Sequence, residues 1–230
     1  MVTAYQITGL NRRDKDLHYN SLKLLKEGYF NYNKVDIPLS IIFSSRNLSM
    51  INGEKIGKKP FGIVLTRSAN INLNTIYVNR HKEFKGQYID NLCQAIGIVL
   101  AEQIMDNLSD NIENKDKYYK TIFIGLAHYI TNKMLGIIDS IKASEQMADE
   151  IRQLGESTTL NEISLAVASL LVSNEKIEVC NIENPRLQRL IVDLCKKLEV
   201  AYKNLISDME LVSIEYEDIV LTLMKIEKSI

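Results

Sequence analysis

Residues 75–108, TIYVNRHKEFKGQYIDNLCQAIGIVLAEQIMDNL, join a strand pattern to a long helix pattern. Residues 75–79 are rich in β-branched and aromatic side chains, which is typical of a strand. A basic segment, residues 80–86, follows and ends in glycine. From Gln87 onward apolar residues recur three or four positions apart, which predicts a helix. The chain therefore changes near residue 86 from short strands and turns to long helices.

The residues before this point predict one helix and a small, mostly antiparallel sheet. A rough helical stripe covers residues 15–29, and Gly28 marks its expected end. Strand patterns occupy residues 39–43, 61–66 and 75–79. Between the first two of these strands lies Asn52-Gly53, the strongest short signal for a β-hairpin, because both central residues of its turn need positive φ.

The residues after this point predict a multi-helix bundle. Residues 118–140 are apolar almost all round, which indicates a central helix, and this helix could continue through Ile151. Gly97 and Gly125 lie inside predicted helices, where close helix contact is the best reason for a glycine. Thr159 and Glu162 form a capping box before a helix that reaches residue 173, and Asn184-Pro185 begins another.

Residues 185–230 carry the most regular apolar spacing of the chain. One continuous helix would be about 69 Å long at 1.5 Å per residue and would pair with a partner. A break at Ser207-Asp208 would instead give two helices that fold back into the bundle, and we favour this alternative. The candidate oligomer seam for the first alternative consists of Leu198, Leu205, Met209, Val212, Tyr216, Ile219 and Leu223.

The sequence thus predicts an α+β, predominantly α-helical fold with a small antiparallel sheet in the N-terminal third followed by a multi-helix bundle. Residues 1–85 form a basic α/β region and residues 86–230 an acidic helical bundle, either separate or sharing one core. Residues 1–85 hold 14 Lys+Arg and 6 Asp+Glu, a net +8, and the remainder holds 14 and 23, a net −9. A surface of one sign concentrates partners of the opposite sign.

The positive charge gathers around predicted turns, where long side chains reach phosphates without disturbing a core. Phe61, Tyr77, His81 and Phe84 are available for base stacking, but strand alternation turns some of them inward. The candidate residues for binding nucleic acid or an acidic protein partner are Lys55, Lys58, Lys59, Arg67, Arg80, Lys82 and Lys85.

Catalytic motifs are missing from the sequence. The segment GEKIGKK, residues 53–59, has three residues between its glycines and no Ser/Thr after its lysines, so it is not a phosphate-binding loop. There is no HExxH, no GxSxG and no dinucleotide fingerprint. The element order is similar to that of small metallopeptidase-like domains, but the corresponding helix, residues 91–102, carries no histidine, so no site is transferred.

The remaining reactive residues favour structural roles. We expect His128 to be a hydrogen-bonded core residue, and Glu102 and Asp106 to lie on a solvated helix face. The three cysteines, Cys93, Cys180 and Cys195, lack close pairing and are expected to act as small buried residues. We therefore expect neither a cofactor nor a metal.

Membrane segments are also not expected. The most apolar stretch, residues 119–138, contains Lys120, His128, Asn132 and Lys133, which a membrane span rarely tolerates. The N-terminus has no apolar run after a basic start. The expectation is a cytoplasmic protein without a membrane partner.

Three functions remain open. The leading hypothesis is a non-enzymatic binding or assembly protein whose basic N-terminal part contacts nucleic acid or an acidic protein surface. The second is a structural protein that assembles head to tail through its basic and acidic halves. The third is an enzyme with a dispersed site, built from residues such as Glu102, His128 and surface arginines.

Overall fold

The chain forms two compact units, Met1–Val99 and Leu100–Ile230. The structure, a computed structural model, describes residues 5–32, 38–45, 50–51, 54–55, 61–68, 73–109, 117–173, 175–176, 180, 182–207 and 213–230. The change from strands to helices lies where the sequence predicts it, because helix α3 begins at Tyr88 and ends at Ser109. The division between the two units falls farther along, within α3. The mostly helical α+β class is confirmed.

The first unit contains a four-stranded mixed sheet in the order β1-β2-β6-β5. β1 (Tyr5–Thr8) is parallel to β2 (Leu39–Ser44), and β2 is parallel to β6 (Leu73–Asn79). Only β5 (Ile63–Ser68) runs antiparallel to its neighbour β6 within this sheet. The prediction of a mostly antiparallel sheet is therefore wrong in strand direction. One cause is that the predicted strands β2 and β6 pair in parallel, and the other is β1, which the sequence pattern did not reveal and which adds a second parallel pair through a helical crossover.

A second, two-stranded sheet matches the hairpin prediction. β3 (Met50–Ile51) pairs antiparallel with β4 (Glu54–Lys55), so that Met50 faces Lys55 and Ile51 faces Glu54. Two residues, Asn52 and Gly53, separate the paired strands. This spacing is that of a two-residue hairpin.

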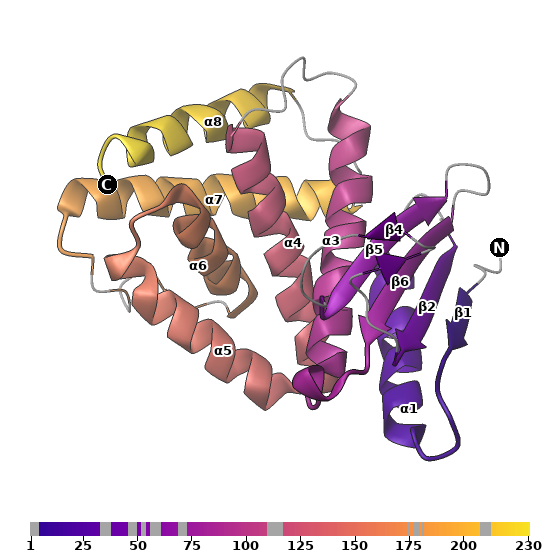
Figure 1. Cartoon of the computed structure of the whole chain (residues 1–230). Helices are drawn as coiled ribbons and strands as arrows, with labels where there is room; N and C mark the ends of the chain where they lie inside the picture. Colours follow the sequence, from indigo (N-terminus) through magenta and orange to yellow (C-terminus); the bar gives the residue numbers. More distant parts are fainter. Residues whose placement is uncertain are drawn as a thin grey trace. The chain divides into compact units, whose positions relative to one another are not determined.

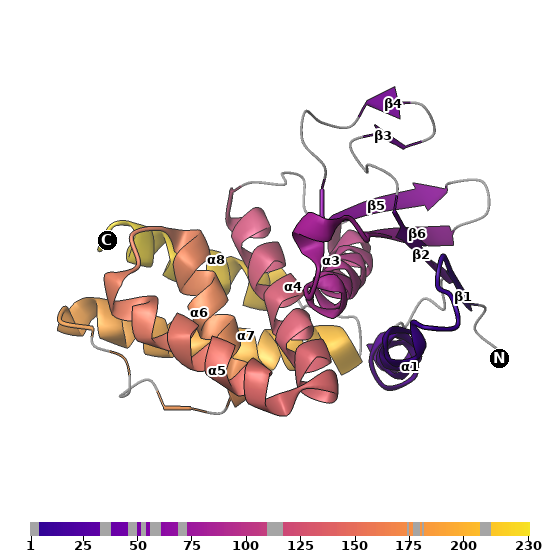
Figure 2. The ribbon, with the colours of Figure 1, turned by 60° about the horizontal axis from the view of Figure 1, so that its bottom comes forward.

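The core of the first unit lies on one face of the four-stranded sheet. Ile41 pairs with Ile76 and Phe43 with Val78, and all four side chains are buried. Paired residues point to the same face, so alternate residues of both strands form one apolar surface. Figure 2 shows α1 (Lys15–Lys23) and α3 on the same side of this sheet.

The helical segment after α1 is longer than predicted. The chain continues as a π-helical turn, η1 (Leu24–Tyr29), and a short α2 (Phe30–Tyr32). Gly28 lies inside η1 and is buried there, so the prediction that it ends the helix is wrong. The wider turn brings Leu24, Leu25 and Tyr29 fully into the core.

The second unit is a bundle in which α6 (Leu160–Ser173) contacts four other helices. These helices are α4 (Lys117–Ile138), α5 (Ser140–Gln153), α7 (Pro185–Ser207) and α8 (Ser213–Glu227). α4 also packs against α5, as Figure 1 shows. By length and composition α4 could cross a membrane, but 56% of its most apolar window is buried inside the structure. The core of a bundle accounts for that composition.

Polar caps set several helix boundaries. The Asp139 side chain accepts a hydrogen bond from Lys142 N at 3.0 Å, so α4 and α5 are separate helices rather than one running through Ile151. A 3-10 turn, η3 (Leu154–Glu156), ends α5. The capping box is confirmed, because Glu162 N donates to Thr159 Oγ1 and Thr159 N donates to Glu162 Oε2. Asn184 Oδ1 caps α7 by accepting from Arg186 N.

α7 and α8 are two helices that pack against each other, so a single helix over residues 185–230 is excluded. Lys197 joins them: its Nζ lies 2.7 Å from Asp193 Oδ2 on its own helix and 2.9 Å from Asp218 Oδ2 on α8. The same Nζ donates to Thr222 Oγ1.

Gly125 has the packing role that the sequence indicates. A β-carbon added to this residue of α4 would overlap Ser164 Oγ of α6 and the Tyr202 hydroxyl of α7. Tyr202 is fully buried, and its ring lies 5.3 Å from that of Tyr129. A glycine here lets three helices approach closely.

Candidate nucleic-acid interface

Three parallel strands of the first unit end at the same edge of its sheet. The chain leaves β1, β2 and β6 at this edge, because all three strands point in one direction. Residues 9–14 follow β1 and lead into α1, and residues 80–85 follow β6 and include the 3-10 turn η2 (Lys82–Phe84). Loops at the carboxyl ends of parallel strands are common ligand-binding positions.

Arg80 ties the two segments together. Its Nη2 lies 2.8 Å from Asp14 Oδ1, and its Nη1 donates to Asp14 Oδ2 at 3.1 Å and to Gly9 O at 3.0 Å. The backbone N of Arg80 also donates to Ser44 O at the end of β2. Hydrogen bonding from the Asn11 N–H and from Arg80 lowers the pKa of Asp14. Arg80 is thus held in place by the ends of all three strands.

Gly9 makes the turn after β1 possible. Its φ of 79° lies in the left-handed region. An added β-carbon would also overlap the carbonyl oxygen of Phe43. Both observations require glycine at this position, so the backbone of β1 can approach β2 closely as it turns toward α1.

Five cations at this edge are exposed. We call them the carboxyl-edge cations: Arg12, Arg13, Lys15, Lys82 and Lys85. Within the described part of the chain none of the five forms an ion pair. Counting Arg80, six cations oppose the three acids Asp14, Asp16 and Glu83, which gives the edge a net charge of +3. The His81 ring lies 3.6 Å from Glu83 in a solvent-accessible pair.

The structure separates the residues that the sequence grouped together. Arg67 of β5 pairs with Asn74, at the start of β6, whereas Arg80, Lys82 and Lys85 follow the end of β6. The separation of six positions between residues 74 and 80 corresponds to about 20 Å along a strand. Lys55 belongs to β4, and Lys58 and Lys59 lie outside the described residues.

Three of the carboxyl-edge cations were not predicted from the sequence. Arg12, Arg13 and Lys15 reach this edge because β1 places them there, and β1 itself was missed. The signal that could have identified them is the pair Arg12-Arg13 directly before a helix start. Of the predicted stacking residues, Phe61 is 43% exposed and the others are partly buried.

Most residues of the predicted oligomer seam are either buried within the bundle or lie outside the residues that the structure describes. Leu198, Ile219 and Leu223 are at most 2% exposed, so their apolar surface is already covered within the chain. Tyr216 is partly buried. The side chain of Leu205 and the residues Met209 and Val212 lie outside the description.

A polar cluster of the second unit surrounds Glu150 of α5. His128 Nε2 of α4 lies 2.7 Å from Glu150 Oε2, Ser169 of α6 donates to the same oxygen, and Gln146 donates to Oε1. Asn132 donates to Ser169 Oγ at 2.9 Å. Burial alone would raise the pKa of Glu150, but the hydrogen bond and charge of His128, with Ser169 and Gln146, outweigh it and lower the pKa.

This cluster does not have the geometry of a nucleophilic triad. In such a triad the imidazole lies between the hydroxyl and the carboxylate. Here the imidazole of His128 and the hydroxyl of Ser169 both contact the Glu150 carboxylate. The Ser169 hydroxyl is therefore oriented as a donor to Glu150. Glu102, the other residue of the enzyme hypothesis, is exposed on α3. No group of three or more His, Cys, Asp or Glu arranged for a metal occurs among the described residues.

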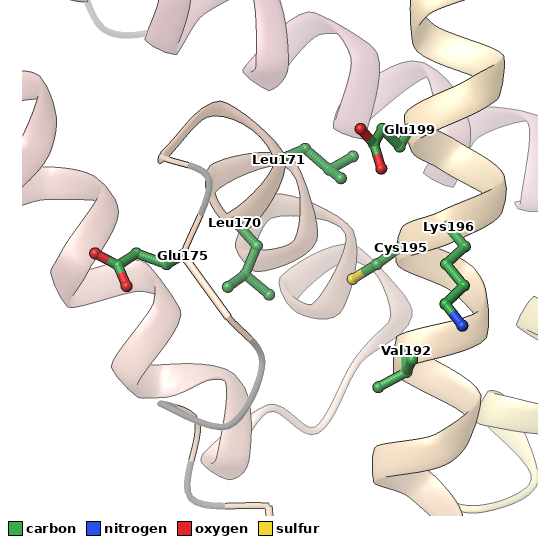
Figure 3. A pocket seen from close by; sticks show the side chains of 7 residues that line it. All are labelled: Leu170, Leu171, Glu175, Val192, Cys195, Lys196 and Glu199. Carbon is green, nitrogen blue, oxygen red and sulfur yellow. The ribbon is translucent and has the colours of Figure 1, made fainter.

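Two of the cavities that adjoin α6 lie beside reactive side chains. One of about 300 Å³ has Leu170, Leu171, Val192 and Cys195 in its walls and Glu175, Lys196 and Glu199 around them (Figure 3). Burial raises the pKa of the Cys195 thiol to about 12, so this thiol stays protonated and is a poor nucleophile. The other, of about 310 Å³, is lined by Glu150, Glu156 and Glu162, of which Glu162 already serves in the capping box.

Comparison with known proteins gives no relative for this chain. No family model matches it, and no curated protein or solved structure matches it.

Proposed function

We propose that this protein is a non-enzymatic nucleic-acid-binding protein whose carboxyl-edge cations contact the phosphate backbone. The observation that carries the proposal is the placement of five exposed cations without ion-pair partners, among the described residues, at one edge of the four-stranded sheet. Phosphate contacts from lysine and arginine give most of the affinity of sequence-independent binding.

The contacts of Arg80 at this edge are consistent with this role. Arg80 is engaged by Asp14 and Gly9, so it positions the two segments rather than binding a ligand. The remaining cations are left for phosphates. Arginine at positions 12 and 13 offers the planar, bidentate donor geometry that suits a phosphate group.

The experiment compares charge reversals at the two ends of the sheet. One variant combines Arg12→Glu with Arg13→Glu, a second combines Lys82→Glu with Lys85→Glu, and Arg67→Glu is the matched control at the opposite end. Affinity for a labelled oligonucleotide is measured by fluorescence anisotropy as a function of salt. Each lost phosphate contact should reduce the slope of log K against log salt by about one for duplex DNA.

The expected result is a weakened complex and a shallower salt dependence for both double variants, with Arg67→Glu close to the unmodified protein. Each double variant changes the net charge by −4 and Arg67→Glu by −2, so a loss in Arg67→Glu about half that of each double variant would show that net charge alone drives binding. Absence of binding by the unmodified protein at about 50 mM salt would overturn the proposal.

A second candidate function is head-to-tail assembly of copies of the chain. It is supported by the charges of the two compact units: residues 1–99 hold 14 Lys+Arg and 7 Asp+Glu, a net +7, and residues 100–230 hold 14 and 22, a net −8. Light scattering at low and high salt tests it. Assembly that dissociates as salt rises supports this function, and a monomer at every salt concentration removes it.

A further inference from the structure

The outer face of α1 and η1 combines cations with one highly exposed aromatic ring. Lys15, Tyr19, Lys23 and Lys26 follow one another at spacings of four, four and three residues, which places them on one side of a helix. Tyr19 is 66% exposed. The opposite side of the same segment carries the buried residues Ser21, Leu24 and Leu25. Packing against the core therefore does not account for the aromatic ring.

Tyr19 differs from the other exposed apolar side chains in its surroundings. Tyr5 is 43% exposed and its ring packs 5.9 Å from that of Phe30. Ile141 is 72% exposed but belongs to the acidic second unit. Tyr19 is an aromatic residue with a lysine four positions away on either side, and its face leads at the N-terminal end directly to Arg12 and Arg13 of the carboxyl edge.

The charge balance of this face favours a polyanion. Lys15, Lys23 and Lys26 are accompanied by two exposed acids, Asp16 and Glu27. With Arg12 and Arg13 included, the face from residue 12 to residue 27 has five cations against these two acids and the Arg80-paired Asp14. Successive positions of the stripe lie about one helical turn, 5.4 Å, apart.

We propose that the ligand of this surface is single-stranded nucleic acid, which runs along α1 with a base stacked on Tyr19. The inference rests on the proposed function and names the strand class that the site prefers. Proteins that bind single strands combine a cationic track with aromatic rings, because unpaired bases expose their π-faces. A duplex offers its phosphates to the cations but keeps its bases stacked internally, so it gains nothing from Tyr19.

The test measures the binding of an oligo-dT strand and of a duplex to Tyr19→Ala, with Tyr19→Phe as the conservative variant and Ile141→Ala as the control for an exposed apolar truncation. A stacked base contributes about 1–3 kcal/mol, so Tyr19→Ala should weaken single-strand binding about 5- to 150-fold. Tyr19→Phe should retain the affinity of the unmodified protein. Duplex binding should be the same for all variants.

A spectroscopic readout makes the test independent of affinity. The chain contains no tryptophan, so Tyr19→Trp introduces a single indole at this position. Its fluorescence should be quenched when oligo-dT binds and should stay unchanged with the duplex. An indole that keeps its emission in a saturated single-strand complex would overturn the inference.

The failures of the two proposals are distinguishable. If Tyr19→Ala binds the single strand as well as the unmodified protein while Arg12→Glu/Arg13→Glu binds weakly, the stacking inference is wrong and the proposed function stands. If neither strand type binds the unmodified protein at low salt, both are wrong. If the unmodified protein binds a duplex more tightly than a single strand, the inference of a single-stranded ligand is wrong and the proposed function stands.

Discussion

The carboxyl edge of the first unit and the bundle of the second unit use the same charged residue types in opposite ways. In the bundle, acids outnumber cations, with 22 Asp+Glu against 14 Lys+Arg over residues 100–230, and several of the cations have carboxylate partners within the chain. Lys117 pairs with Glu227, Lys203 with Glu199 and Arg152 with Asp149, while Lys197 bridges α7 and α8. At the sheet edge, only Arg80 has a close carboxylate partner among the described cations of that edge.

Stability does not explain this difference, because exposed ion pairs contribute only about 0–1 kcal/mol each. The difference instead determines what each surface offers to solvent. A bundle with a net charge of −8 repels a polyanion, whereas an edge with six cations and three acids attracts it. The two units hold 14 Lys+Arg each, so the comparison teaches that the local balance of cations and acids, rather than the number of cations, identifies the binding surface.

The largest effect should come from Gly9, on which the geometry of the edge depends. Gly9→Ala must accept a left-handed φ and an overlap with the Phe43 carbonyl, so we expect a loss of roughly 3 kcal/mol or more in the free energy of unfolding. Gly86→Ala is the control, because its φ of 89° is also positive but no atom lies within 4 Å of the added carbon. It should lose only about 1–2 kcal/mol. Urea unfolding checks both, and equal losses would contradict the close approach of β1 and β2.

A smaller effect is expected from the corresponding close contact in the bundle. Gly125→Ala should lose about 1–3 kcal/mol, because Ser164 and Tyr202 must both move and Ser164 would give up its bond to Thr121 O. Gly136→Ala in the same helix meets no atom within 4 Å and should be neutral or stabilising by up to about 1 kcal/mol. Thermal unfolding of the two variants checks this. A Gly136→Ala variant less stable than Gly125→Ala would refute the packing argument.

The smallest effect concerns the polar cluster and depends on pH. The pKa of Glu150 is lowered from 4.5, so its contribution to stability is present above pH 4.5 and is lost as the pH falls through the folded-state pKa. Glu150→Gln should cost about 1–2 kcal/mol at pH 7, since hydrogen bonds to a charged group are weakened. This cost should shrink as the pH falls below 4.5. Denaturant unfolding measured from pH 3 to 7 checks this, with Glu145→Gln, on the exposed side of the same helix, as the control for removal of a carboxylate.

Local signals in the sequence gave correct elements where the local chemistry is sufficient. The capping box at Thr159, the cap at Asn184 and the hairpin at Asn52-Gly53 each need only residues within a few positions of each other. β1 could not be identified in the same way. It has four residues, and its only strand partner, β2, lies beyond an entire helix.

For a related reason, the spacing of residues in the sequence could not decide how the C-terminal helices pack or which cations form one surface. The spacing of Leu198, Ile219 and Leu223 fits an oligomer seam as well as a buried stripe, and only the packing of α7 on α8 shows that they are buried within the chain. Likewise, Arg67 and Arg80 are close to the same turns in sequence, but strand direction places them at opposite ends of β6. Pairing across the sheet decides which charges are neighbours.

Connectivity gives the carboxyl edge a consequence for folding. β5 and β6 are consecutive strands and pair antiparallel, so their contacts close short loops. β1 pairs only with β2, and Tyr5 reaches Leu39 across the whole of α1. A partly folded sheet of β2, β5 and β6 therefore lacks the strand that places Arg12, Arg13 and Lys15. A polyanion that needs all of these cations binds only the complete sheet, and by mass action it stabilises the docked state of β1.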